Sequence, residues 1–225
     1  DFTDRISVSS MFDLILGAAG EDAHRRGFGI EFLAQNNCGW VLSRICFELD
    51  RLPKEYEQIT LHTWINDYNR LSSTRNFALY DEEGNEFGRA VSQWCMLNME
   101  SRQVVDMSLL KETYERAMVD EPSPISAPAR LRPAEYTASS EYTVAYSDID
   151  FNRHMNTLRY VDMIFDAISL DVIENNCGMR IDFNFIAEAR YGERLTIAHS
   201  HEGNTWLFEI SSSEKTLCRA KVEFK

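Results

Sequence analysis

The chain has 225 residues, 44% of them hydrophobic and 26% charged, with a net charge of −13 at pH 7. A chain of this length can bury a substantial core, either as one large domain or as two small ones. The acidic balance disfavours nucleic-acid or anionic-membrane binding, because both need a basic surface. No apolar run approaches the roughly 20 residues of a membrane span, and the first residues lack a signal-peptide pattern.

Periodicity predicts a helix at roughly residues 10 to 26, which Ser9 or Ser10 caps and Gly27 ends. Four segments rich in β-branched and aromatic residues then predict strands at 40–50, 59–66, 75–80 and 86–98. A short helical stretch follows near residues 109–118. Residues 122–135 have linker composition, with prolines separated by Ser and Ala.

The second half repeats this order. We predict a strand at 142–146, a helix from Asn156 to about Glu174, and strands at 179–188, 195–201, 206–211 and 217–224. Two echoes at corresponding strands indicate a duplication: Arg44-Ile45-Cys46-Phe47 resembles Arg180-Ile181-Asp182-Phe183, and Gly88-Arg89-Ala90 resembles Cys218-Arg219-Ala220. The predicted fold is therefore α+β, with one unit at 1–121, a linker at 122–135 and a second unit at 136–225, each a long helix wrapped by an antiparallel sheet.

Cysteine and histidine usage predicts a cytoplasmic protein without a metal or cofactor. The cysteines are odd in number and form no C-x-x-C pair, which fits reduced thiols. The histidines, including His199 and His201, show no metal-ligand spacing. The five cysteines are Cys38, Cys46, Cys95, Cys177 and Cys218.

The run from Tyr146 to Asn156, YSDIDFNRHMN, carries the densest polar chemistry in the chain. Asp150, Asn152 and His154 alternate at period two, so in an extended stretch they would point the same way. Asn156 can cap the following helix, whose free backbone N–H groups can stabilise a carbonyl oxygen that gains negative charge. A purely structural turn is the alternative. Capping needs one polar residue rather than four, so we predict an active site.

The whole pattern resembles the acyl-ACP (acyl carrier protein) thioesterases of the double hotdog fold. The Tyr146–Asn156 run is similar to the active-site signature of that family. First-half landmarks also resemble the family: Trp40-Val41-Leu42-Ser43-Arg44, Trp64 and Arg89-Ala90-Val91-Ser92-Gln93-Trp94. The resemblance implies two tandem hotdog units, the first holding the acyl chain and the second carrying catalysis.

The catalytic set that the resemblance implies is Asp150, Asn152, His154 and Glu188. Glu188 is placed by Phe185-Ile186-Ala187-Glu188-Ala189, which resembles an aromatic-x-x-Glu-Cys stretch of the family; without the resemblance it could be an ordinary solvated strand end. Because the Cys of the plant members is Ala189 here, a thiol nucleophile cannot act at this position. Water is then the simplest nucleophile.

Each member of this set has an expected role. Glu188 would orient or deprotonate water, His154 would bond the reacting carbonyl or the same water, and Asn152 would position the thioester. Asp150 would hold His154 or Asn152 by hydrogen bonding. Which group is the base stays open. On the first helix, Met11, Phe12 and Ile15 could be core or could line an acyl tunnel.

The expected function is hydrolysis of fatty acyl-ACP to free fatty acid and ACP. The alternatives are an acyl-CoA thioesterase and a hotdog acyl-binding protein without turnover. ACP is acidic, so its docking on an acidic chain requires a local basic patch. Candidate residues for this patch are Arg25, Arg26, Lys54, Arg130 and Arg132. No nucleic acid or membrane span is expected, and the oligomeric state is left open, with a homodimer as one option.

Overall fold

The computed structural model describes residues 1–176 and 178–225, so the predicted thiol of Cys177 lies outside the described residues. The chain divides into two compact units. The N-terminal unit comprises Asp13–Cys46 and Tyr56–Pro128; the C-terminal unit comprises Asp1–Phe12, Phe47–Glu55 and Ala129–Lys225. None of the described helices is long and apolar enough to cross a membrane.

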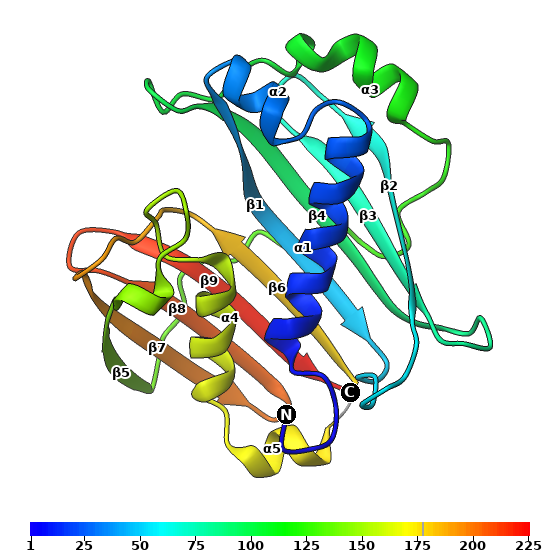
Figure 1. Cartoon of the computed structure of the whole chain (residues 1–225). Helices are drawn as coiled ribbons and strands as arrows, with labels where there is room; N and C mark the ends of the chain where they lie inside the picture. The colour runs from blue at the N-terminus through cyan, green and yellow to red at the C-terminus, as the bar shows by residue number, and fades with distance from the viewer. Residues whose placement is uncertain (177) are drawn as a thin grey trace. The chain divides into compact units, whose positions relative to one another are not determined.

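In the N-terminal unit, a helix packs on an antiparallel sheet of strand order β2-β3-β4-β1 (Figure 1). The helix is α1 (Val8–Arg25), whose buried residues Ile15, Ala19 and Ala23 recur every four positions. Gly27, at φ 82°, ends it in the left-handed region that favours glycine. The strands are β1 (Cys38–Leu49), β2 (Thr60–Tyr68), β3 (Ser73–Tyr80) and β4 (Glu86–Asn98). The predicted first helix and four strands are confirmed.

Three short helices complete the N-terminal unit: α2 (Ile30–Gln35), the 3-10 helix η1 (Met107–Leu110) and α3 (Lys111–Ala117). The prediction missed α2, because six residues are too few to show a helical period. Buried rings gather beneath these helices, with the centroids of Phe28 and Tyr114 5.1 Å apart. An ion pair of 2.8 Å joins Asp22 of α1 to Arg75 of β3, whose side chain is buried. Burial opposes the ionisation of Asp22, but hydrogen bonds from Arg26 and Arg75 outweigh it and hold its pKa below the usual range.

The C-terminal unit repeats the arrangement, with α4 (Thr157–Asp166) against a sheet of order β6-β9-β8-β7-β5 (Figure 1). Its strands are β5 (Ala138–Thr143), β6 (Met179–Phe185), β7 (Arg194–Glu202), β8 (Thr205–Ser211) and β9 (Thr216–Phe224). Val161 and Ile164 of α4 are fully buried, as are Ile181 and Phe183 of β6. The core of this unit therefore lies between α4 and the sheet.

Three predicted boundaries in this half are wrong. The single helix predicted from Asn156 to Glu174 is two helices, α4 and α5 (Leu170–Asn175). Helix α4 ends at Asp166, and Ser169 has extended geometry immediately before α5. The first strand lies at β5, and Tyr146 opens the 3-10 helix η2 (Tyr146–Asp148) instead. Strand β6 stops at Phe185, three residues before Glu188.

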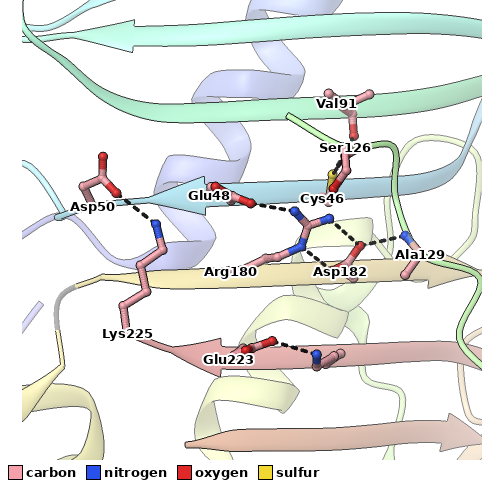
Figure 2. A network of polar contacts seen from close by, with 11 residues as sticks. Cys46, Glu48, Asp50, Val91, Ser126, Ala129, Arg180, Asp182, Glu223 and Lys225 are labelled. Carbon is pink, nitrogen blue, oxygen red and sulfur yellow. Dashed lines mark hydrogen bonds and ion pairs between the residues drawn. The ribbon is translucent and has the colours of Figure 1, made fainter. Parts of the chain in front are cut away.

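The start of the chain segment after Pro128 is fixed on β6 by buried polar side chains (Figure 2). The N–H of Ala129 donates to Asp182 at 2.8 Å, and the N–H of Leu131 donates to Asn184 at 3.0 Å. Arg180 bridges Asp182 and Glu48, with distances of 2.9 and 2.6 Å (Figure 2). These contacts leave Arg130 and Arg132, which flank Leu131, exposed to solvent.

Candidate active site

The run from Asp150 to His154 is a tight turn between η2 and α4. The N–H of Asp150 donates to the carbonyl of His154 at 2.9 Å, and the N–H of Arg153 donates to the carbonyl of Asp150 at 3.0 Å. Arg153 adopts the left-handed conformation, at φ 65°. The segment is therefore not extended, and its side chains do not follow the period-two alternation of a strand.

Asn156 caps α4, as predicted: its side-chain oxygen accepts the N–H of Leu158 at 2.9 Å. Asn156 is therefore both the last residue of the polar turn and the residue from which the apolar helix begins. Its own N–H donates to the carbonyl of Asp148 at 2.7 Å, which closes the turn against η2. Asn156 thus joins the turn to η2 through its main chain and to α4 through its side chain.

Asp148 is the buried anchor of this turn. Its fully buried carboxylate accepts hydrogen bonds from Arg159 Nε at 2.8 Å, from the Tyr142 hydroxyl at 2.8 Å and from the Ala145 N–H at 2.7 Å. Burial opposes its ionisation, but these three hydrogen bonds outweigh that cost and hold its pKa below the usual range. Sequence reasoning gave Asp148 no separate role, because its partners meet only once the turn has folded.

The carboxylate of Asp150 organises the turn through its main chain. Its Oδ1 accepts the N–H groups of Asn152 at 2.8 Å and His154 at 3.2 Å. The sequence predicted a hydrogen bond from Asp150 to one of these two residues, and the contacts go to their backbones. Asn152 itself is exposed at the tip of the turn, and its contact with a thioester stays a prediction.

Glu188 and His154 meet although 34 positions separate them. His154 Nε2 lies 3.3 Å from Glu188 Oε2, and the two side chains are 14% and 38% exposed. The N–H groups of Ile186 and Ala187 both donate to the carbonyl of Leu217, at 2.8 and 3.2 Å. Two residues of one strand therefore lie opposite a single residue, Leu217, of its neighbour. This bulge-like irregularity ends β6 and changes the direction of the chain.

Further contacts fix the segment that carries Glu188. The N–H of Met155 donates to the carbonyl of Ala189 at 2.8 Å, and Lys215 Nζ donates to the carbonyl of Glu188 at 2.7 Å. The hydroxyl of Tyr160 on α4 accepts the N–H of Ala189 at 3.3 Å. The backbone on both sides of the His154–Glu188 contact is therefore anchored, which holds an imidazole and a carboxylate within reach of one water molecule.

The thiols in the described part of the chain show no sign of activation. Burial raises the pKa of Cys38, Cys95 and Cys218. Cys46 is buried, and its one S–H lies within reach of the carbonyls of Ser126 and Val91, at 3.3 and 3.7 Å from the sulfur (Figure 2). At the position after Glu188, Ala189 is fully buried. Among the described residues, no group of three His, Cys, Asp or Glu side chains is placed to hold a metal ion.

The structure also places the residues predicted to line an acyl tunnel and those predicted to contact ACP. Met11, Phe12 and Ile15 are all buried, and Phe12 packs on the ring of Phe47 at 4.9 Å. Two of the predicted docking cations are paired with acids of α1: Arg25 with Glu21 and Arg26, just after the helix, with Asp22. The other three predicted cations, Lys54, Arg130 and Arg132, are exposed, and their contact with an acidic partner stays a prediction.

Two helix-and-sheet units in one chain, the second with a polar turn at the start of its helix, define a double hotdog protein of the thioesterase type. The family models agree: residues 1–115 match the acyl-ACP thioesterase N-terminal domain and residues 131–225 match its C-terminal domain. The chain belongs to the acyl-ACP thioesterase family.

The chain is also similar to solved structures. An acyl-ACP thioesterase from Bacteroides thetaiotaomicron is 33% identical, with a TM-score of 0.92 over 100% of this chain and 92% of that one. The 12:0-ACP thioesterase from Umbellularia californica, 18% identical with a TM-score of 0.85 over 99% of this chain and 91% of that one, shares the fold.

Among curated relatives, an oleoyl-acyl carrier protein thioesterase from Arabidopsis thaliana is 23% identical over 74% of this chain. A palmitoyl-acyl carrier protein thioesterase from Cuphea hookeriana is 25% identical over 64% of this chain. The chain spans half or less of the length of these curated relatives, 50% and 37% respectively.

Proposed function

We propose that this protein hydrolyses the thioester of fatty acyl-ACP, releasing a free fatty acid and ACP. The observation that carries the proposal is the 3.3 Å contact between His154 and Glu188, beside the turn that Asp150 organises. Family membership supplies the substrate class, since the relatives described above are named as thioesterases of acyl carrier proteins.

In the proposed reaction, Glu188 accepts a proton from water, and the water oxygen forms the new bond to the thioester carbon. His154 donates a hydrogen bond to the reacting carbonyl or to the same water, and Asn152 positions the thioester from the tip of the turn. The carbon–sulfur bond then breaks, and the proton passes to the departing thiolate. A thiolate is a good leaving group, so water activation and stabilisation of the oxyanion are the main demands.

Glu188 is the better candidate for the base, because its side chain is 38% exposed and so accessible to water, whereas that of His154 is 14% exposed. Asp150 acts as a positioning residue, because its carboxylate binds the N–H groups that fix the turn. We propose that residues 136–225 carry catalysis, and that residues 1–121 accommodate the acyl chain.

The test is an activity screen of the purified protein on acyl-ACP and acyl-CoA over a range of chain lengths, with release of free fatty acid as the readout. We expect the higher kcat/KM with acyl-ACP. Raising the salt concentration should increase KM for acyl-ACP more than for a neutral short-carrier thioester, because salt screens contact with the acidic ACP surface.

Charge reversal at Arg130 and Arg132 sharpens this test, since both are exposed. The double variant should use acyl-ACP less well, with an unchanged rate on the short-carrier thioester. Equal salt responses and an unaffected double variant would instead favour an acyl-CoA thioesterase. Binding of acyl thioesters without any release of fatty acid would show an acyl-binding protein.

A further inference from the structure

An open hollow of about 700 Å³ is lined by residues of the active-site turn and its neighbours in the C-terminal unit. It is lined by Tyr146, Ser147, Ile149, Asp150, Phe151, Arg153 and Tyr191. Its size is within the range of small-molecule sites. The proposed reaction uses only Asp150 from this lining, so the remaining residues have no role in it.

Three aromatic side chains on the rim of the hollow are exposed: Tyr146 by 88%, Phe151 by 82% and Tyr191 by 70%. Large apolar side chains usually lie inside a protein, and a cluster of them at the surface marks a site of contact. Aromatic rings supply much contact area at a low cost in conformational entropy. The rim is therefore suited to the apolar part of a flexible ligand.

Arg153 adds a positive charge to the same hollow. Its side chain is exposed and pairs with no acid in the described part of the chain, although the net charge of the whole chain is −13. Its backbone is left-handed at φ 65°, where glycine is the favoured residue. The main-chain hydrogen bonds of the turn account for the left-handed backbone, but no side-chain contact within the described residues accounts for an arginine at this position.

We propose that this hollow binds the phosphopantetheine arm of the acyl carrier protein, with Arg153 at the arm's phosphate and the aromatic rim on its pantoyl methyl groups. This inference rests on the proposed function. A thioester at His154 and Glu188 has its carrier arm attached at sulfur, and the hollow lies on the turn that carries His154. The hollow offers what the arm needs: one cation for one phosphate, and apolar surface for the chain.

Binding of the arm's phosphate by Arg153 is tested with two substrates that differ only in that phosphate, acyl-4′-phosphopantetheine and acyl-pantetheine. The readout is the ratio of their kcat/KM values. In Arg153→Gln this ratio should fall about tenfold, the size of one charge-assisted hydrogen bond. Arg153→Lys should restore most of it. Arg153→Gly should lose the preference while it raises the melting temperature, because glycine relieves the left-handed backbone.

Matched controls come from the N-terminal unit. Arg102 is also an exposed arginine at positive φ, 57°, and Arg102→Gln should leave the ratio unchanged. For the rim, Phe151→Ala with Tyr146→Ala should lower kcat/KM on both substrates, whereas Tyr56→Ala, which removes a tyrosine that is 91% exposed, should not. An unchanged ratio in a folded Arg153→Gln protein would overturn the proposal.

Comparing holo-ACP, which carries the arm, with apo-ACP tests the hollow without turnover. Holo-ACP should bind more tightly to the 225-residue chain, and Arg153→Gln should remove the difference. If the wild type hydrolyses no thioester but shows this Arg153-dependent difference in binding, the proposed hydrolysis is wrong, whereas the proposed binding of the arm in the hollow is supported. Equal binding of the two ACP forms, or a dimer that Phe151→Ala dissociates, would assign the rim to another contact and overturn the inference.

Discussion

Asp148→Asn should destabilise the protein and loosen the active-site turn. The wild-type carboxylate is fully buried and accepts hydrogen bonds from Arg159, Tyr142 and Ala145, all at 2.7 to 2.8 Å. Asparagine keeps one oxygen acceptor and turns an NH₂ group toward one of these donors. The substitution therefore loses the charge and at least one hydrogen bond in a buried place.

The expected loss is about 2–3 kcal/mol of unfolding free energy. Removing one partner of a buried ion pair costs about 3–5 kcal/mol. Arg159 is 35% exposed, so water can solvate the freed guanidinium and the cost should be lower. For a chain of this length, such a loss corresponds to a decrease of roughly 5–10 °C in melting temperature. Thermal unfolding followed by circular dichroism measures it.

The pH dependence of this loss has a definite sign. The folded pKa of Asp148 is below its usual range, so its contribution is present above the unfolded pKa, about 4. It is lost as the pH falls through the depressed folded value. The stability gap between wild type and Asp148→Asn should therefore be constant near neutral pH and narrow below about pH 4.

Asp162→Asn is the matched control, because Asp162 pairs with the same Arg159 at 2.6 Å but is 29% exposed. We expect it to cost less than about 1 kcal/mol, as is usual for accessible ion pairs. Equal losses in the two variants, or an Asp148→Asn gap that does not change with pH, would refute the assignment of Asp148 as the anchor.

Two further predictions concern the cap and the thiols. Asn156→Ala should cost about 1 kcal/mol of stability, because it removes the acceptor for the Leu158 N–H; urea denaturation would measure the cost, and no loss would contradict the capping role. A folded variant with all five cysteines replaced should retain turnover, because Ala189 offers no thiol beside Glu188. Mass spectrometry should find no acyl-cysteine during the reaction, and trapping one would rule out water as the direct nucleophile.

The sequence predicted the elements whose periodicity is long and regular. The first helix, the four strands of the first half and the Asn156 cap follow from local patterns, and the structure has them. The break between α4 and α5 was missed, because the apolar pattern continues across it and Ser169 makes no side-chain cap that would mark it. Tertiary context decided a boundary that periodicity could not.

The active-site turn shows the same limit. The polar residues of the run were identifiable from the sequence, but the extended geometry assumed for them was wrong. The carboxylate of Asp150 accepts the N–H groups of Asn152 and His154 and so folds the segment into a turn. The approach of Glu188 to His154 depends on the irregular end of β6, where two N–H groups share the carbonyl of Leu217. Residue-by-residue resemblance to the family suggested Glu188, and no spacing rule could have done so.

The most direct test of the account is a double-mutant cycle of His154→Ala and Glu188→Gln, measured as free fatty acid released from acyl-ACP. Each single variant should lower kcat by at least about a hundredfold, the scale for loss of an acid, base or oxyanion group. The double variant should be little worse than either single one, because the two residues act on one water. Near wild-type turnover in a folded Glu188→Gln or His154→Ala protein would contradict the central claim.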